Sequence, residues 1–438
     1  MTDNMNIDPS FLRGLTQARM SRRDLLKAAG AGAGVMGLEA FLAACGAGGS
    51  GTGGASPQSS SQISADVAKI YAGQPNGSFV FGQWPLYIDK TKNAQGQIVH
   101  PSLDIFTKKT GIKVDYQESI QDNGSFFGQV QPQLQAGQSI GYDIIVVTNG
   151  EFLTKYVTLG YLWPLDPSKR PNFDKNAAPW VASPTYDPGN VYTMAWQSGI
   201  TGIGWDPVQV AKLRPSNPKI TSTMDLFDPA FKGKVGMFGE SSDFPNTGLL
   251  AAGVSPETST EADWQKAADL LAKQKSDGIV RQYYEQNYIN ALSNGDIAVC
   301  QAWSGDIFQT NLSGDSQGLQ FLVPPEGALI WTDNMCIPKN AQNPVDAMTY
   351  MDYVYQPDVQ AMIEEWVNYI CPVPSAQAIV EADAATASGG TATYLNDVAK
   401  SPLVFPSQAD VDKLHSYRVL TADEQVTWNN LFQPIYQG

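Results

Sequence analysis

Acidic and aromatic side chains recur together where short predicted strands end. Most residues of the set are placed in this way, and Trp331 and Asp333 lie within an extended segment; the set is Trp84, Tyr87, Glu240, Asp243, Trp303, Trp331 and Asp333. Trp331 and Asp333 are two residues apart, so an extended chain turns both toward the same side. In α/β sheets, ligands bind beyond the carboxyl ends of the strands. The set therefore predicts one ligand site with aromatic walls and negative charge.

One short string imitates a catalytic motif. Residues 137–141 read Gly-Gln-Ser-Ile-Gly and match the G-x-S-x-G pattern of a nucleophile elbow. Such an elbow needs a strand before the serine and a helix after it, whereas the sequence predicts a polar helix before it and a strand after it. The chain has two histidines, His100 and His415, which excludes a His-rich metal site. No Walker A motif or G-x-G-x-x-G follows a predicted strand. We therefore expect a protein that is not an enzyme and uses no cofactor or metal.

The charge balance narrows the class of ligand. The 438 residues include 43 Asp and Glu against 28 Lys and Arg, a net charge of -15. Nucleic-acid binding needs a basic face, so we expect no nucleic-acid partner. An acidic body suits a cationic ligand, although acidity also serves solubility.

The N-terminus carries export signals. Residues 1–44 contain Arg22-Arg23 and then a short apolar run, which is typical of a twin-arginine (Tat) signal peptide. The run is shorter than the ~20 strongly apolar residues of a membrane span. It ends in Leu42-Ala43-Ala44-Cys45, which resembles a lipobox whose cysteine is acylated. Residues 45–77 are expected to form a flexible tether, since the stretch from 46 to 62 is mostly Gly, Ser, Ala, Pro and Gln. We expect a lipoprotein anchored on the outer, periplasmic or extracellular face of the cytoplasmic membrane.

Three further cysteines follow the proposed lipid anchor. They are Cys300, Cys336 and Cys371. Three thiols allow one disulfide at most, and the sequence leaves open whether any pair forms.

Helical and strand patterns alternate through the rest of the chain. Residues 103–110 predict a helix that Gly111 ends. Residues 143–147 predict a strand that is almost wholly apolar, as expected for a strand covered on both faces by helices. The alternation predicts an α/β fold.

Several segments resemble the spermidine/putrescine-binding proteins of bacterial ABC importers. Residues 324–341 read PPEGALIWTDNMCIPKNA and are similar to that family's P-x-E-G-x-x-x-W-x-D-x-x-x-I-P-x-x-A segment. Residues 231–236 and 292–305 resemble its Y-K-G-K-V and G-E/D…W-x-G segments. The similarity covers roughly residues 78–438.

The resemblance implies a two-lobed periplasmic-binding-protein fold with hinge strands and a ligand cleft between the lobes. Lobe 1 is expected at 78–192 with a return segment at about 335–375, and lobe 2 at 193–334. Residues 376–438 are expected to form a C-terminal helical segment that packs on the lobes. The crossover strands are expected at 191–203 and 329–337.

The resemblance also assigns ligand-binding roles to matching positions. These are Trp84, Tyr87, Asn149, Glu240, Asp243, Trp303, Trp331, Asp333 and Gln433. Asp333 is expected to hold one amine and the two lobe-2 acids another, with the tryptophans along the ligand's stem. Two family tyrosines are replaced, one near Asn149 and one where Ile370-Cys371-Pro372 stands in place of Gly-Tyr-Pro.

The function implied is capture of spermidine or putrescine by a monomeric substrate-binding lipoprotein, which delivers it to an ABC permease. One alternative is the same scaffold with another small organic cation, an amino-acid derivative or an opine as ligand. A more distant alternative is an anchored extracellular hydrolase that uses Glu240 and Asp243 as acid and base. A three-residue spacing on one loop disfavours placement of the two acids across a scissile bond.

Overall fold

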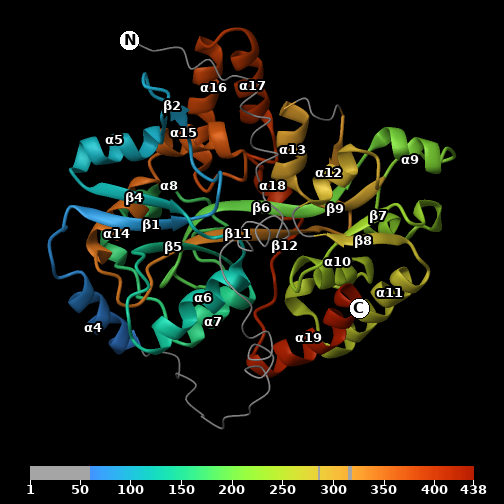
Figure 1. Cartoon of the computed structure of the whole chain (residues 1–438), viewed down its shortest axis with the longest axis horizontal. Helices are drawn as coiled ribbons and strands as arrows, with labels where there is room; N and C mark the ends of the chain where they lie inside the picture. Colours follow the sequence, from blue (N-terminus) through green and yellow to red (C-terminus); the bar gives the residue numbers. More distant parts are fainter. Residues whose placement is uncertain (1–59, 285–286, 314–317) are drawn as a thin grey trace, which may run out of the picture.

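The computed structural model describes residues 60–284, 287–313 and 318–438 (Figure 1). The expected signal peptide at 1–44 and the expected lipidation site at Cys45 lie outside the described residues.

A mixed sheet runs through the whole described body. Its main path is β4-β1-β5-β11-β6-β9-β7-β8, with β10 added beside β6 and β12 beside β11. The strands of this sheet are β1 (Ser78–Gln83), β4 (Lys113–Glu118), β5 (Ile144–Thr148), β6 (Met194–Trp205), β7 (Val235–Phe238), β8 (Val280–Tyr284), β9 (Val299–Trp303), β10 (Gln320–Leu322), β11 (Ala328–Cys336) and β12 (Leu414–His415). A separate pair is formed by β2 (Thr91–Lys92) and β3 (Ile98–Val99).

Helices surround this sheet in both halves of the molecule (Figure 1). They are α4 (Ser60–Ile70), α5 (Pro101–Thr110), α6 (Asn123–Gln135), α7 (Glu151–Thr158), α8 (Pro171–Asn176), α9 (Pro207–Leu213), α10 (Asp243–Ala251), α11 (Glu261–Ser276), α12 (Tyr288–Ser293), α13 (Ser304–Ser313), α14 (Pro344–Tyr353), α15 (Pro357–Val367), α16 (Gln377–Thr386), α17 (Gly389–Lys400), α18 (Gln408–Val411) and α19 (Ala422–Gln437). Short 3-10 turns connect several of them.

Two long antiparallel strands join the halves. β11 pairs with β5 on one side and with β6 on the other, and β6 also pairs with β9. We call the half that contains β1, β4 and β5 lobe 1, and the half that contains β7, β8 and β9 lobe 2. The two-lobed α/β fold with hinge strands is confirmed, because β6 and β11 lie close to the ranges expected for the crossovers.

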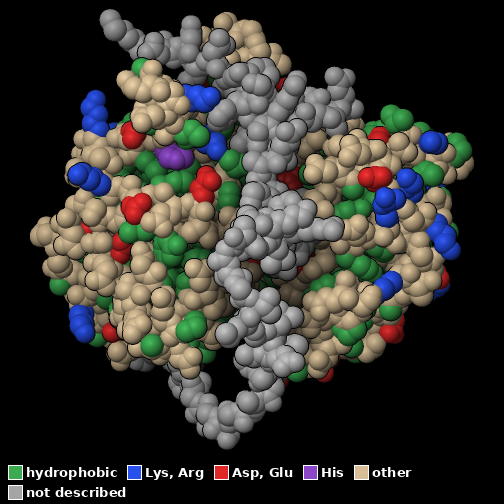
Figure 2. Space-filling model, viewed as in Figure 1, with side chains coloured by type: hydrophobic (Ala, Val, Ile, Leu, Met, Phe, Trp, Pro, Cys, Tyr) green, Lys and Arg blue, Asp and Glu red, His purple; other side chains and the backbone are tan. Residues whose placement is uncertain are grey.

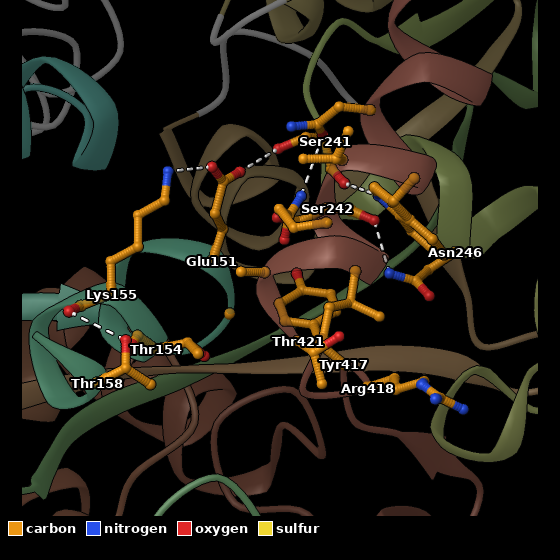
Figure 3. A pocket seen from close by; sticks show the side chains of 17 residues that line it. Glu151, Thr154, Lys155, Thr158, Ser241, Ser242, Asn246, Tyr417, Arg418 and Thr421 are labelled. Atoms are coloured by element: carbon orange, nitrogen blue, oxygen red, sulfur yellow. Dashed lines mark hydrogen bonds and ion pairs between the residues drawn. The ribbon is translucent and has the colours of Figure 1, made fainter. Parts of the chain in front are cut away.

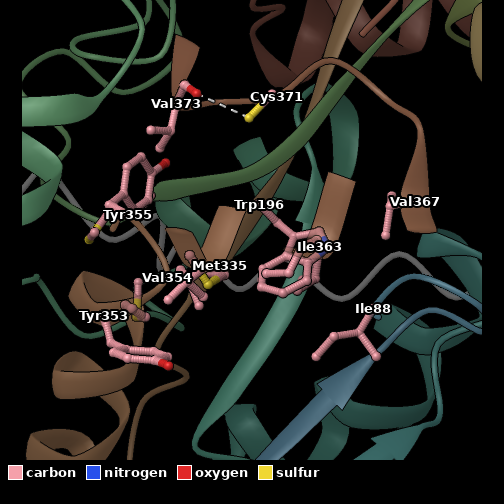
Figure 4. Packing of buried hydrophobic residues seen from close by; sticks show 14 of the residues in the cluster. Ile88, Trp196, Met335, Tyr353, Val354, Tyr355, Ile363, Val367, Cys371 and Val373 are labelled. Atoms are coloured by element: carbon pink, nitrogen blue, oxygen red, sulfur yellow. Dashed lines mark hydrogen bonds between the residues drawn. The ribbon is translucent and has the colours of Figure 1, made fainter. Parts of the chain in front are cut away.

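Each lobe has its own core. The largest cluster lies in lobe 1, where Trp196, Met335, Ile363 and Tyr355 lie among the buried apolar side chains (Figure 4). Helices α16 and α17 contribute to the same cluster. In lobe 2 the Trp428 ring of α19 meets Trp264 of α11 edge to face, with 5.2 Å between centroids. The C-terminal segment therefore divides, with α16 and α17 on lobe 1 and α19 on lobe 2.

The expected tether is wrong over its second half. Residues 60–70 form α4, and Tyr71 directly after it is buried, with its hydroxyl 3.0 Å from the Pro164 carbonyl oxygen. The physical reason is an apolar stripe: Ile63, Val67 and Ile70 recur at helical spacing. Val67 and Ile70 pack against the lobe-1 core.

Three further features bear on the sequence expectations. Cys300, Cys336 and Cys371 are buried free thiols in the structure. Between residues 60 and 438, leaving out 285–286 and 314–317, no helix has both the length and the apolar character of a membrane span.

On the face shown in Figure 2, the described Lys and Arg side chains are scattered over both lobes.

Candidate functional site

The hinge strand β11 carries the central carboxylate. Asp333 is buried, and the strand places it between Thr148 of β5 and Gln197 of β6 in the ladder. Its Oδ1 accepts a hydrogen bond from the Thr148 hydroxyl at 2.6 Å, and its Oδ2 accepts one from the Tyr87 hydroxyl at 2.8 Å. Burial raises the pKa of Asp333 to about 6 against the opposing effect of these two hydrogen bonds. The group therefore titrates close to neutral pH.

The loop after β1 is held in a fixed shape. Leu86 has a φ of 59°, a left-handed conformation that is rare for a branched residue. The neighbouring Trp84 donates its indole N–H to the Val146 carbonyl oxygen of β5 at 3.1 Å. The Trp196 indole N–H is bonded to the Tyr87 carbonyl oxygen at 3.0 Å. These bonds fix the point from which Tyr87 reaches Asp333.

Glu240 and Asp243 lie at the start of α10. Glu240 accepts hydrogen bonds from the backbone N–H groups of Ser242, Asp243 and Phe244, so it caps the helix. Burial raises the pKa of Glu240, and the negative charge of Asp243 raises it further. Burial likewise raises the pKa of Asp243. Buried Asp243 and partly buried Glu240 therefore lie close together at the start of α10, where a bound cation would stabilise their ionised forms.

Asp243 is surrounded by donors from three parts of the chain. Its Oδ2 accepts bonds from the Thr201 hydroxyl at 2.8 Å and the Trp303 indole N–H at 3.0 Å. Its Oδ1 accepts a bond from the Tyr417 hydroxyl at 2.5 Å. Thr201 belongs to β6 and Trp303 to β9, whereas Tyr417 comes from the segment between β12 and α19. Trp303, expected along the ligand's stem, is thus bonded directly to a lobe-2 acid through its indole N–H.

Aromatic rings pack against one another near these acids. Trp331 lies 5.5 Å from Tyr369 between ring centroids, and Tyr369 lies 5.6 Å from Tyr87. Opposite Trp331 on β6 is Gly199, where a Cβ atom would lie 2.2 Å from the indole Cζ2. Only glycine leaves room for the ring at this point. On the lobe-2 side, Trp303 packs 4.7 Å from Phe238.

Two predicted residues have other surroundings. Asn149 is buried, and its Oδ1 accepts from the Thr332 backbone N–H at 2.8 Å, so it extends the pairing of β5 with β11 beside Asp333. Gln433 is exposed on α19, whose buried face consists of Trp428, Phe432 and Ile435. The structure thus places Gln433 in solvent and not among the buried acids.

Sequence reasoning missed several contributors. Tyr369 supplies an aromatic ring near the position where the family tyrosine is replaced, and Tyr417 supplies a donor to Asp243. The sequence did hold a signal for Tyr369. It lies two residues before Cys371, the position that aligns with the family tyrosine, so a tyrosine two residues away could replace the lost ring. Nothing in the sequence marked Tyr417, since its position depends on how the C-terminal segment crosses between the lobes.

The lobes meet at the rim of this site. The Ser241 hydroxyl of lobe 2 lies 3.3 Å from Glu151 Oε2 of lobe 1. A groove of about 410 Å³ lies here between α7, the 241–242 loop and the segment 417–429 (Figure 3). Tyr417 lines this groove with its ring while its hydroxyl reaches inward to Asp243.

The fold and the site define a class of protein. Buried Asp333 and Trp331 lie on β11, which joins the two lobes, and buried Asp243 is bonded to Thr201 of the other joining strand, β6. Such an arrangement suits a small solute held between the lobes. Residues 102–389 match the family of bacterial extracellular solute-binding proteins, and the chain belongs to that family. Its members bind solutes for transport and are not enzymes.

The similarity to polyamine-binding proteins is confirmed by relatives of known name. The chain is 30% identical over 356 residues to the putrescine-binding periplasmic protein SpuD of Pseudomonas aeruginosa, covering 79% of this chain and 91% of that protein. It is 32% identical over 291 residues to the putrescine-binding periplasmic protein PotF of Escherichia coli, covering 64% and 76%. Among solved structures, the spermidine/putrescine substrate-binding protein PotD of Streptococcus pneumoniae matches with a TM-score of 0.66 and 21% identity, over 83% of this chain and 99% of that one.

Proposed function

We propose that this protein captures a polyamine such as putrescine or spermidine in the cleft between its lobes and delivers it to an ABC permease. The observation that carries the proposal is the buried Asp333 carboxylate on the strand shared by both lobes, with Tyr87, Trp331 and Tyr369 beside it. A protonated amine prefers a carboxylate, and its methylene stem prefers flat apolar walls. The putrescine-binding relatives support the same ligand class.

The ammonium of the ligand would bind at Asp333. A carboxylate has about four lone-pair positions, and the described residues supply donors to two of those on Asp333. A charge-assisted hydrogen bond contributes about 1.5–3 kcal/mol, and a desolvated cation–π contact adds up to about 2 kcal/mol. Micromolar affinity needs about 8 kcal/mol in total. One ammonium at Asp333 and one cation–π contact together supply up to about 5 kcal/mol of that amount, and burial of the apolar stem beside the rings adds to it.

Ligand binding would also favour the closed arrangement of the lobes. The acids of lobe 2 and the acid on β11 carry charge of the same sign, so their repulsion opposes closure. A cation between them removes that repulsion and selects the closed form. We propose that the permease recognises this closed form of a monomer.

Export and anchoring complete the proposal. We propose that the Tat signal directs export and that acylation of Cys45 holds the protein at the outer face of the cytoplasmic membrane. Replacement of Cys45 by Ala should release the protein from the membrane fraction, whereas membrane retention of that variant would contradict the anchor.

Isothermal titration of the purified protein tests the ligand class. The ligands are putrescine, spermidine, arginine and γ-aminobutyrate. Micromolar or tighter binding of a polyamine, with the two amino acids weaker, is the expected result. Binding of γ-aminobutyrate or arginine alone would favour the alternative ligand class of amino-acid derivatives, and no binding of any of the four would contradict the polyamine assignment.

A further inference from the structure

The C-terminal segment inserts one side chain among the acids. Tyr417 is buried, and its ring lies 3.5 Å from the point where a Cβ atom on Gly150 of lobe 1 would stand. Its hydroxyl donates to Asp243 of lobe 2. Burial raises the pKa of Tyr417, as do the negative charges of Asp243, Glu240 and Asp333. The hydroxyl is therefore close to the acids of lobe 2 and within the electrostatic reach of Asp333.

Tyr417 reduces the acceptor capacity that Asp243 offers to a ligand. With Tyr417, Trp303 and Thr201 bound, the described residues fill three of about four lone-pair positions on Asp243. Asp333 has two such positions filled. An incoming ammonium must therefore displace a donor of the chain to gain more than one bond at Asp243, whereas Asp333 accepts it without displacement.

We propose that Tyr417 is a specificity-determining residue that closes the Asp243 end of the cleft and makes the site prefer a short diamine to a longer polyamine. This inference rests on the proposed function. A short diamine places one ammonium on Asp333 and leaves the Tyr417–Asp243 bond intact. A triamine such as spermidine extends farther, and its far ammonium competes with the Tyr417 hydroxyl for Asp243 Oδ1.

The test compares the affinities of putrescine and spermidine in the wild type, Tyr417→Phe and Tyr417→Ser. The phenylalanine variant removes only the hydroxyl, and the serine variant also removes the ring. Tyr71→Phe is the matched control, because Tyr71 is another buried tyrosine whose hydroxyl is bonded, there to the Pro164 carbonyl oxygen.

We expect the wild type to bind putrescine more tightly than spermidine. In both Tyr417 variants the ratio should move toward spermidine by about tenfold or more, because one charge-assisted bond at Asp243 becomes available to the ligand. The Tyr71→Phe control should keep the wild-type ratio. If Tyr417→Ser does not fold, as judged by its melting curve, the Tyr417→Phe variant decides.

Two outcomes overturn the inference in distinguishable ways. Tight polyamine binding with the same ratio in the wild type and both Tyr417 variants would remove the role of Tyr417 and leave the proposed function standing. Absence of putrescine and spermidine binding in all folded proteins would overturn the proposed function and the inference together.

Discussion

Replacement of Asp333 by Asn tests the centre of the proposed site. Asn keeps the shape of the side chain, and the Tyr87 and Thr148 hydroxyls can each donate or accept, so the local hydrogen bonds can be re-formed. What the variant loses is the negative charge opposite the ligand's ammonium. Because a hydrogen bond to a charged group contributes about 1.5–3 kcal/mol, putrescine affinity should fall roughly 10- to 150-fold.

The pH dependence of affinity offers an independent check on the same residue. With a pKa of about 6, Asp333 is nearly all ionised at pH 8 and only about one tenth ionised at pH 5. Since only the ionised form binds a cation well, wild-type affinity for putrescine should be roughly tenfold weaker at pH 5 than at pH 8 from this group alone. The raised pKa values of Glu240 and Asp243 act in the same direction. In the Asp333→Asn variant, the tenfold change in putrescine affinity that comes from Asp333 should disappear, and the part that comes from Glu240 and Asp243 should remain.

Asp352→Asn is the matched control for these measurements. Asp352 is also buried, accepting from the backbone N–H groups of Asn172 and Phe173 and from the Asn172 side chain, and lies in the lobe-1 core away from the cleft. The control should lose stability and keep wild-type affinity at every pH. Titration calorimetry at pH 5 and pH 8 measures the putrescine affinity of each protein, and a melting curve measures its stability. Equal putrescine affinity in the wild type and Asp333→Asn at pH 8 would refute the assigned role of Asp333.

Two further predictions concern stability. Burial raises the pKa of Glu364 well above its usual value, against the opposing effect of the Gln197 and Cys371 side chains. The wild type should therefore match Glu364→Gln in melting temperature near pH 4 and fall progressively below it as pH rises toward 8; a constant difference across pH would contradict this titration. Gly199→Ala should lower the free energy of unfolding by about 1–3 kcal/mol, because the added Cβ meets Trp331. The control Gly128→Ala, in an exposed and open position of α6, should raise it by about 0.5–1 kcal/mol in the same denaturant titration.

The elements that could be predicted are those whose signals are local. The helix Pro101–Thr110 ends at Gly111 with a φ of 78°, a left-handed cap that glycine adopts at low cost. The strand Ile144–Thr148 is apolar because helices cover the sheet, and its composition alone indicated this. Asp333 of β11 and the lobe-2 acids share a neighbour in Tyr417, because the hinge strands bring the edges of both lobes to one place.

The parts that escaped prediction depend on contacts between distant segments. The polar composition of α4 gave no sign of a packed helix in the sequence. The helix is stabilised by contacts of its few apolar residues with lobe 1, and the sequence does not show those contacts. The family resemblance assigns Gln433 to the cleft, whereas the helical phase of α19 turns it to solvent. Tyr417 lies in a segment without a motif, and only the crossing from β12 to α19 carries it to Asp243.

The donors around the acids indicate why closure should depend on the ligand. Asp333 is bonded by Tyr87 and Thr148 of lobe 1, whereas Asp243 is bonded by Thr201 and Trp303 on the lobe-2 side of the hinge. Each acid is thus satisfied largely within its own half. The Ser241–Glu151 bond between the lobes is long at 3.3 Å and half-exposed, and such a bond contributes about 1 kcal/mol. A cation that interacts with acids of both halves adds several times that amount, so we infer that the ligand, more than the contacts at the rim, determines how long the lobes stay together.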